Sequence, residues 1–280
     1  MTVRWPVAAA GSGPLVFAHR GASAEAPEHT LAAFGLAVEQ GADGLEADVR
    51  RTADGVLVCV HDRTLRRTTG GAGAGIVIST TGLAEIERYD VGSWHSEGYR
   101  GQRVPTVRAL LTLARGAGRP LWVALETKHP TRHGGRVERD LAQLLTEEGL
   151  TSPDPLGVSV ALMSFDGRAV SRFAALLPDL PCVLLRDRPP LDRLPGAGIG
   201  ADCEGWGVAA IRARPGVVAQ ARARGRGVAV WTVDDPADVA LCRDLQVDAI
   251  ITNRPAAVRA QLGPRGRGRR NEDDDPVALR

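Results

Sequence analysis

Hydrophobic and polar positions follow two repeating patterns along the chain. Short, nearly continuous apolar runs, typical of parallel strands buried on both faces, recur between longer segments with helical spacing. The expected strands are residues 15–18, 44–49, 56–60, 121–126, 158–164, 182–185, 228–233 and 248–252. Helical periodicity fits residues 30–40, 107–115, 137–148, 168–177, 215–224 and 236–244. This alternation predicts an α/β fold, a (β/α)₈ TIM barrel, although a doubly wound sheet gives a similar pattern.

Two stretches interrupt the alternation. Residues 63–104 follow the third expected strand, contain a cluster of glycines and are longer than an ordinary connection. No Gly-Lys-Ser/Thr follows these glycines, so they predict a flexible loop rather than a phosphate cradle. The last segment, residues 263–280, combines an arginine run with an acidic run, as a disordered tail would. We therefore expect a barrel over residues 1–262, with an insertion at about 63–104, and a disordered tail.

Composition narrows the class of protein. The 280 residues include 35 basic and 33 acidic side chains, a formal net charge of +2, and aromatic residues at 4%. So small a charge with so few stacking platforms argues against a nucleic-acid partner. The sequence has no run of 18 apolar residues, so we do not expect stable membrane insertion. The first 15 residues do not have the pattern of a signal peptide. The four cysteines form no CxxC pair and are expected to be reduced core residues; they are Cys59, Cys182, Cys203 and Cys242. Reduced cysteines favour a cytoplasmic protein.

Carboxylates and one lysine lie at the ends of two expected strands. Glu46 and Asp48 are two residues apart, so both face one side of their strand, and Glu126 and Lys128 repeat this spacing. In a barrel such strand ends converge on one mouth. Three close carboxylates repel one another unless a cation intervenes, and oxygen ligands suit Ca²⁺ or Mg²⁺. The pattern predicts one bound divalent cation.

Two histidines and two cations complete this mouth. His19 and His61 end two other expected strands, and imidazoles titrate near working pH, which fits an acid and base pair. Arg20 offers a fork matched to phosphate. Lys128 is the single lysine among 35 basic residues, so it marks a place where arginine does not serve. Together these groups indicate phosphoryl chemistry at a diester.

An ordered set of motifs strengthens this interpretation. The early motifs are His19-Arg20-Gly21, Pro27-Glu28-His29-Thr30, Glu46-Ala47-Asp48-Val49, Thr52-Ala53-Asp54-Gly55 and Val60-His61-Asp62. The later motifs are Val104-Pro105-Thr106, Glu126-Thr127-Lys128, Ser164-Phe165-Asp166, Val230-Trp231-Thr232-Val233 and Ile250-Ile251-Thr252-Asn253-Arg254-Pro255. Through these motifs the chain resembles the glycerophosphodiester phosphodiesterase family over roughly residues 15 to 256.

The resemblance implies a TIM barrel of the phospholipase C-like phosphodiesterase type with a small insertion after the third strand. It implies one Ca²⁺ or Mg²⁺ ion, and its ligands would be Glu46, Asp48 and Glu126. His19 and His61 would be the acid and base. Substrate contacts would come from Arg20, Lys128, Trp231 and Glu28.

The implied reaction is hydrolysis of small glycerophosphodiesters, such as glycerophosphocholine or glycerophosphoethanolamine, to an alcohol and sn-glycerol 3-phosphate. One departure is His29, where the family usually has Asn, which changes the hydrogen bonding around Glu28. A lysophospholipase D-like hydrolase is an alternative, but residues 69–79 offer no aromatic acyl groove. A catalytically silent barrel that only binds would lack an acid, a base or a ligand, and none is missing. The sequence leaves the choice of ion and the oligomeric state open.

Overall fold

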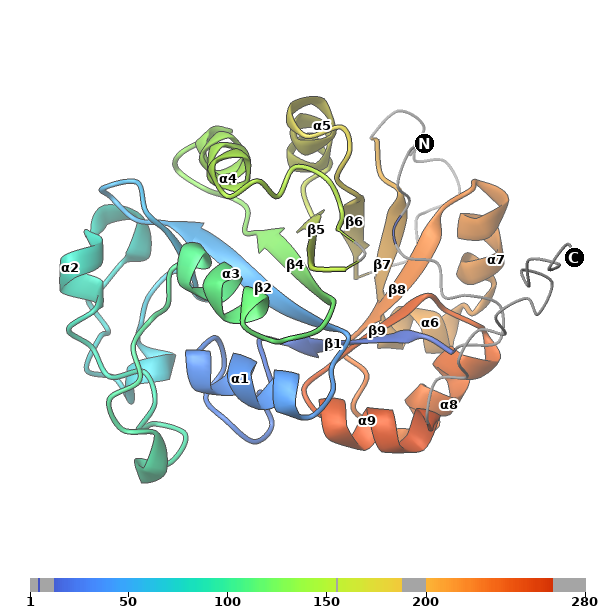
Figure 1. Ribbon diagram of the computed structural model, residues 1–280, viewed down its shortest axis with the longest axis horizontal. Helices are drawn as coiled ribbons and strands as arrows, with labels where there is room; N and C mark the ends of the chain where they lie inside the picture. Colours follow the sequence, from blue (N-terminus) through green and yellow to red (C-terminus); the bar gives the residue numbers. More distant parts are fainter. Residues whose placement is uncertain (1–4, 6–12, 155, 188–199, 264–280) are drawn as a thin grey trace, which may run out of the picture.

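Parallel strands close into a ring at the centre of the molecule (Figure 1). The computed structural model describes Trp5 and residues 13–154, 156–187 and 200–263. Eight of the nine strands in the sheet are parallel and run in the order β1-β9-β8-β7-β6-β5-β4-β2, and pairing of β1 with β2 closes the ring. They are β1 (Leu15–His19), β2 (Gly44–Arg51), β4 (Leu121–Thr127), β5 (Val158–Ser164), β6 (Cys182–Arg186), β7 (Cys203–Gly207), β8 (Gly227–Trp231) and β9 (Ala249–Thr252). The predicted (β/α)₈ barrel is confirmed.

Two strand assignments were wrong in detail. The run at 56–60 forms β3 (Leu57–Cys59), which pairs antiparallel with β2 and lies outside the ring. Because Thr52–Gly55 is a tight turn, the chain folds back as a hairpin instead of crossing to a parallel neighbour. The missing barrel strand is β7, whose Cys-Glu-Gly-Trp-Gly sequence has no continuous apolar run. The insertion therefore starts after the second barrel strand.

Helices cover the outside of the ring. They are α1 (Leu31–Glu39), α3 (Val107–Arg115), α4 (Arg136–Glu147), α5 (Gly167–Leu176), α6 (Val208–Ala213), α7 (Gly216–Ala223), α8 (Pro236–Asp244) and α9 (Pro255–Leu262). Side-chain oxygens of Thr30, Thr106, Asp166 and Asp235 accept hydrogen bonds from the first turns of α1, α3, α5 and α8. These caps satisfy backbone donors and fix where each helix begins. Helices α6 and α9 were not among the predicted segments.

The insertion is an ordered subdomain with its own small core. It contains η1 (Arg67–Thr69), η2 (Ile78–Thr80), α2 (Leu83–Ile86) and η3 (Glu97–Tyr99). Val58 of the β2–β3 hairpin packs with Leu65, Ile78 and Ile86, so the hairpin anchors the insertion. The glycine cluster that was expected to form a flexible loop lies within this insertion, and two of its glycines, Gly70 and Gly71, have positive φ. The predicted tail lies outside the described residues apart from its first residue, Gly263.

Alternation along the strands separates packing from chemistry. Inward side chains near the strand starts are apolar, as in the contact of Trp5 with Phe17, whose ring centroids are 5.4 Å apart. Further along β2, Glu46 and Asp48 face inward while Leu45 and Ala47 join the core under the helices. The ionisable residues therefore collect at the carboxyl ends of the strands, where barrel enzymes carry out their chemistry.

Candidate active site

Strand register places four of the predicted site residues in two pairs. His19 of β1 lies opposite Glu46 of β2, and Asp48 lies opposite Glu126 of β4. Both pairs sit near the carboxyl ends of adjacent parallel strands. The convergence that the residue spacing predicted is thus a direct result of pairing across β1, β2 and β4.

The three carboxylates form one buried cluster. Each offers an oxygen within 4.8 Å of the others, and Glu46, Asp48 and Glu126 are 3%, 1% and 6% exposed. Burial and the charge of Asp48 raise the pKa of Glu46 well above its usual range and that of Glu126 to about 7. Burial alone would also raise the pKa of Asp48, but neighbouring positive groups hold it far below the usual range.

Two fixed cations border the cluster. The Nζ of Lys128 lies 2.7 Å from Oδ1 of Asp48 and 2.6 Å from Oε1 of Glu126. The Nε of Arg20 lies 3.1 Å from Oδ2 of Asp48, and the backbone N–H of Arg20 donates to Oε2 of Glu46 at 3.1 Å. If a bound cation ionised all three carboxylates, the cluster and the two cations beside it would together carry one negative charge. Converging hard oxygen donors with residual negative charge fit a divalent cation such as Ca²⁺ or Mg²⁺.

A hydrogen-bond chain fixes the tautomer of His19. The Nδ2 of Asn253 lies 2.5 Å from Oδ2 of Asp234, which as a carboxylate only accepts, so the amide oxygen of Asn253 must face His19. That oxygen lies 2.7 Å from Nδ1 of His19, which therefore carries the proton and leaves Nε2 with a lone pair. Burial, assisted by Arg20, lowers the pKa of His19 to about 4, so the ring is neutral at pH 7.

His61 follows β3 and lies in a different environment. Its Nδ1 lies 2.7 Å from Oδ1 of Asp62, and its carbonyl oxygen accepts from Nε and a terminal nitrogen of Arg50 at 2.8 and 2.7 Å. The side chain is 37% exposed. Burial lowers the pKa of His61, and the Asp62 carboxylate opposes that change. His61 is therefore held at the solvent side of the cluster.

Glu28 holds Arg20 through a network that includes Arg67, which sequence reasoning did not select. Arg67 donates to both carboxylate oxygens of Glu28, at 2.6 and 2.7 Å, and to Asp62 at 2.8 Å. Arg20 donates to the same carboxylate at 3.2 Å. Burial of Glu28 acts in the opposite direction, yet these charges lower its pKa to about 2. Glu28 thus orients Arg20, and Arg67 ties the loop after β1 to the loop after β3.

His29 contacts a member of the carboxylate cluster. The residue is 4% exposed with φ of 59°, and its Nε2 accepts from the backbone N–H of Asp48 at 3.0 Å. Burial lowers the pKa of His29 to about 3, consistent with a neutral ring that accepts. The altered hydrogen bonding expected around Glu28 therefore extends to Asp48. No sequence signal other than the family departure at this position pointed to it.

Trp231 lies at the end of β8, apart from the charged cluster. Its ring packs edge-to-face on Phe165, with centroids 5.4 Å apart and planes at 88°. Phe165 follows β5 and is 43% exposed. The two rings form an aromatic wall at the mouth of the barrel.

The carboxyl-terminal mouth of this TIM barrel holds an acidic cluster, two cations suited to binding a phosphate, and two imidazoles. This arrangement is typical of the class of phosphoric diester hydrolases. Comparison with known proteins then gives the family. The model of the glycerophosphoryl diester phosphodiesterase family matches residues 19–257. The chain belongs to this family, and its enzyme class is that of the glycerophosphodiester phosphodiesterases.

Individual relatives agree over most of the chain. It is 43% identical over 256 residues to the probable glycerophosphodiester phosphodiesterase 1 of Mycobacterium tuberculosis H37Rv, covering 89% of this chain and 92% of that protein. It is 31% identical over 275 residues to a glycerophosphodiester phosphodiesterase of Bacillus subtilis 168, covering 89% of each. A phosphodiesterase of Oleispira antarctica, solved with the product sn-glycerol-3-phosphate, superposes with a TM-score of 0.79 at 26% identity, covering 89% of this chain and 97% of that one.

The helices of the described residues do not include one that is both long and apolar enough to cross a membrane.

Proposed function

We propose that this chain hydrolyses small glycerophosphodiesters, such as glycerophosphocholine or glycerophosphoethanolamine, to an alcohol and sn-glycerol 3-phosphate with the help of one Ca²⁺ or Mg²⁺ ion. The observation that carries this proposal is the buried cluster of Glu46, Asp48 and Glu126 beside Arg20 and Lys128. When bound, the ion would polarise the phosphate and neutralise its charge. The three carboxylates would hold it.

The two cations would hold the phosphate. Arg20 is oriented by Glu28 and presents donors that match phosphate oxygens. Lys128 adds a point charge on the β4 side. Both charges would stabilise the negative charge that develops as the alcohol leaves.

The two histidines would move protons. His19 is neutral with its lone pair on Nε2, which suits acceptance of a proton from the attacking hydroxyl. His61 would donate to the leaving oxygen, and the Asp62 carboxylate beside its Nδ1 partly offsets the burial that lowers the pKa of this ring. Trp231 would lie against the substrate.

Release of glycerol 3-phosphate from glycerophosphocholine by the purified chain tests this proposal. We expect activity that EDTA abolishes and Ca²⁺ or Mg²⁺ restores. His19→Ala and His61→Ala should each lower kcat by roughly 10²–10⁴-fold with the fold intact. Activity that chelation leaves unchanged would overturn the metal assignment.

A lysophospholipid is the second candidate substrate, because the exposed Phe165 beside Trp231 offers an apolar contact at the mouth. Parallel assays with lysophosphatidylcholine and glycerophosphocholine separate the two candidate substrates.

A cytoplasmic location is also part of the proposal. It is supported by four free, buried cysteines that suit a reducing compartment, namely Cys59, Cys182, Cys203 and Cys242.

A further inference from the structure

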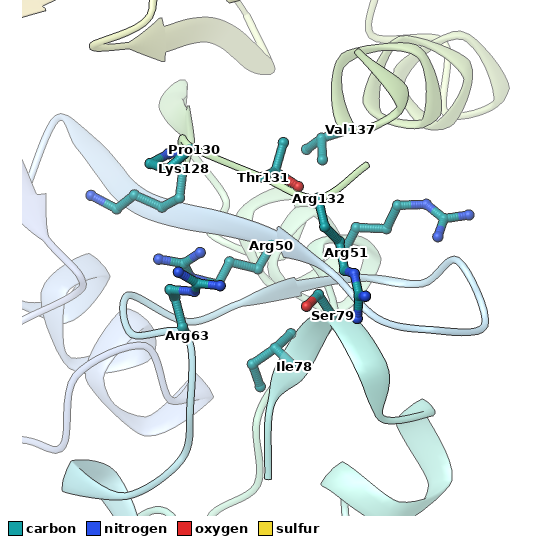
Figure 2. Close-up of a pocket in the computed structure, with 10 residues that line it drawn as sticks. All are labelled: Arg50, Arg51, Arg63, Ile78, Ser79, Lys128, Pro130, Thr131, Arg132 and Val137. Carbon is teal, nitrogen blue, oxygen red and sulfur yellow. The ribbon is translucent and has the colours of Figure 1, made fainter. Parts of the chain in front are cut away.

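A basic pocket opens beside Lys128 (Figure 2). Its cavity volume is small, about 30 Å³. Of the ten lining residues, five are cationic and none is acidic, and the cations are Arg50, Arg51, Arg63, Lys128 and Arg132. They come from the end of β2, the loop after β3 and the loop between β4 and α4. Three separate segments thus bring positive charge to one concave surface.

Only part of this charge is neutralised. Lys128 pairs with Asp48 and Glu126, and Arg51 pairs with Asp140 at 2.5 Å. Arg50 donates to a neutral acceptor, the carbonyl oxygen of His61. Within the described part of the chain, no ion pair forms at three of the pocket arginines, namely Arg50, Arg63 and Arg132.

Arg50 and Arg63 lie close together in this pocket. Their side chains converge beneath Lys128 in Figure 2. Like charges held close together repel, and a bound anion removes this repulsion. Guanidinium forks match the oxygens of phosphate and carboxylate groups. The pocket is therefore built for an anion.

We propose that the pocket is a subsite for a second anionic group on the substrate, a phosphate or carboxylate carried by the alcohol that is released. This inference rests on the proposed function, because it assumes that the diester phosphate occupies the cluster bordered by Arg20 and Lys128. Lys128 lines the pocket as well, so the two sites share a wall. The glycerol moiety is uncharged and gives guanidinium groups little to bind. The alcohol is therefore the part of the substrate that enters the pocket, and anionic alcohols are preferred over choline.

A double variant, Arg63→Gln with Arg132→Gln, removes two of the three unpaired charges and leaves Arg50, which holds the His61 loop, in place. The matched control is Arg66→Gln with Arg139→Gln, which removes the same charge from exposed positions outside the pocket lining. The diester substrates are glycerophosphoinositol 4-phosphate, glycerophosphoserine, glycerophosphoglycerol and glycerophosphocholine. Separately, titration calorimetry measures binding of inorganic phosphate to the chelator-treated protein.

We expect the wild type to have its highest kcat/KM on glycerophosphoinositol 4-phosphate or glycerophosphoserine, and the stronger of the two tells whether phosphate or carboxylate is the natural group. The pocket variant should lose at least about tenfold on these anionic diesters and less than about twofold on glycerophosphoglycerol, while the control variant stays near wild type. Equal losses on neutral and anionic diesters would overturn the proposal.

Calorimetry tests the anion subsite independently of the proposed hydrolase activity. Inorganic phosphate should bind the pocket variant at least about tenfold more weakly than the control variant. If no diester is hydrolysed by the wild type, the proposed function fails, but the phosphate measurement still decides the subsite. Equal phosphate affinities in the two variants would overturn it.

Discussion

The ammonium of Lys128 lies 2.7 Å from the carboxylate of Asp48 and so lies among the oxygens proposed to hold a cation. Because like charges repel, this ammonium weakens the attraction of the cluster for a divalent ion. The same charge would attract the phosphate. Lys128 is therefore expected to favour turnover at the expense of cation affinity.

Replacement of Lys128 by Met separates these two effects. We expect Lys128→Met to bind Ca²⁺ or Mg²⁺ at least about tenfold more tightly, about 1.4 kcal/mol, and to lower kcat/KM by roughly 10²-fold. Calorimetry and steady-state kinetics measure the two quantities. Lys128→Arg retains the charge but not the compact ammonium, and should also be slow. Unchanged metal affinity in the Met variant, or wild-type turnover in the Arg variant, would contradict this account.

The contact between His29 and Asp48 predicts a stability effect that depends on the replacement. His29→Asn replaces the ring nitrogen by an amide oxygen that can accept and is a residue that tolerates positive φ, whereas His29→Ala leaves the buried N–H of Asp48 without this partner. An unsatisfied buried donor costs about 1–3 kcal/mol. Urea unfolding should therefore show the Ala variant less stable than the Asn variant by that amount. Equal stabilities would mean that the hydrogen bond contributes nothing.

Asn253 is expected to position His19 without touching the substrate. Asn253→Ala removes the acceptor that keeps the proton on Nδ1, so kcat should fall about 10–100-fold with little change in KM. Ser23→Ala is the matched control, because Ser23 contacts Asn253 and the carbonyl oxygen of His19 but not the ring. A loss in the Ser23 variant as large as that in the Asn253 variant would point to a general loosening of the loop.

Glu28 predicts a pH dependence of stability. Its pKa is about 2 in the folded protein against an ordinary value of 4.5, so its ion pairs with Arg67 and Arg20 contribute fully above pH 4.5 and are lost as the pH falls toward 2. The shift corresponds to roughly 3 kcal/mol. The free energy of unfolding of the wild type, measured in EDTA, should exceed that of Glu28→Gln by this amount at pH 6, and the gap should shrink as acid is added. A gap that stays constant with pH would rule out the ion pairs as its source.

Much of the site follows from local rules that operate on the sequence. Glu46 and Asp48 share a face because strand side chains alternate, and parallel pairing brings Glu126 beside them. Long apolar runs predict the parallel strands because these strands are buried on both faces. These features depend on neighbours in sequence and on one sheet geometry, so a single chain reveals them.

The remainder depends on longer-range contacts. Cys203–Gly207 becomes a strand only because its neighbours in the ring pair with it, and its two glycines conceal it in the sequence. The Asp-Gly turn at Asp54 and Gly55 signalled a hairpin, but the apolar run after it was interpreted as a barrel strand. Asn253 reaches His19 across 234 residues of chain, a contact that no local spacing specifies.

Strand β2 continues beyond Asp48 to Arg51 and then turns back into β3, on which the insertion is built. The carboxylates thus belong to the portion of β2 inside the ring, whereas the insertion is attached to the portion of β2 outside the ring. Mutations that lengthen, shorten or replace the insertion beyond Arg67, which holds Glu28, are expected to leave the inner portion of β2 in register. Within a lineage of such enzymes, the choice of substrate can therefore drift and diversify while the inherited chemistry stays fixed.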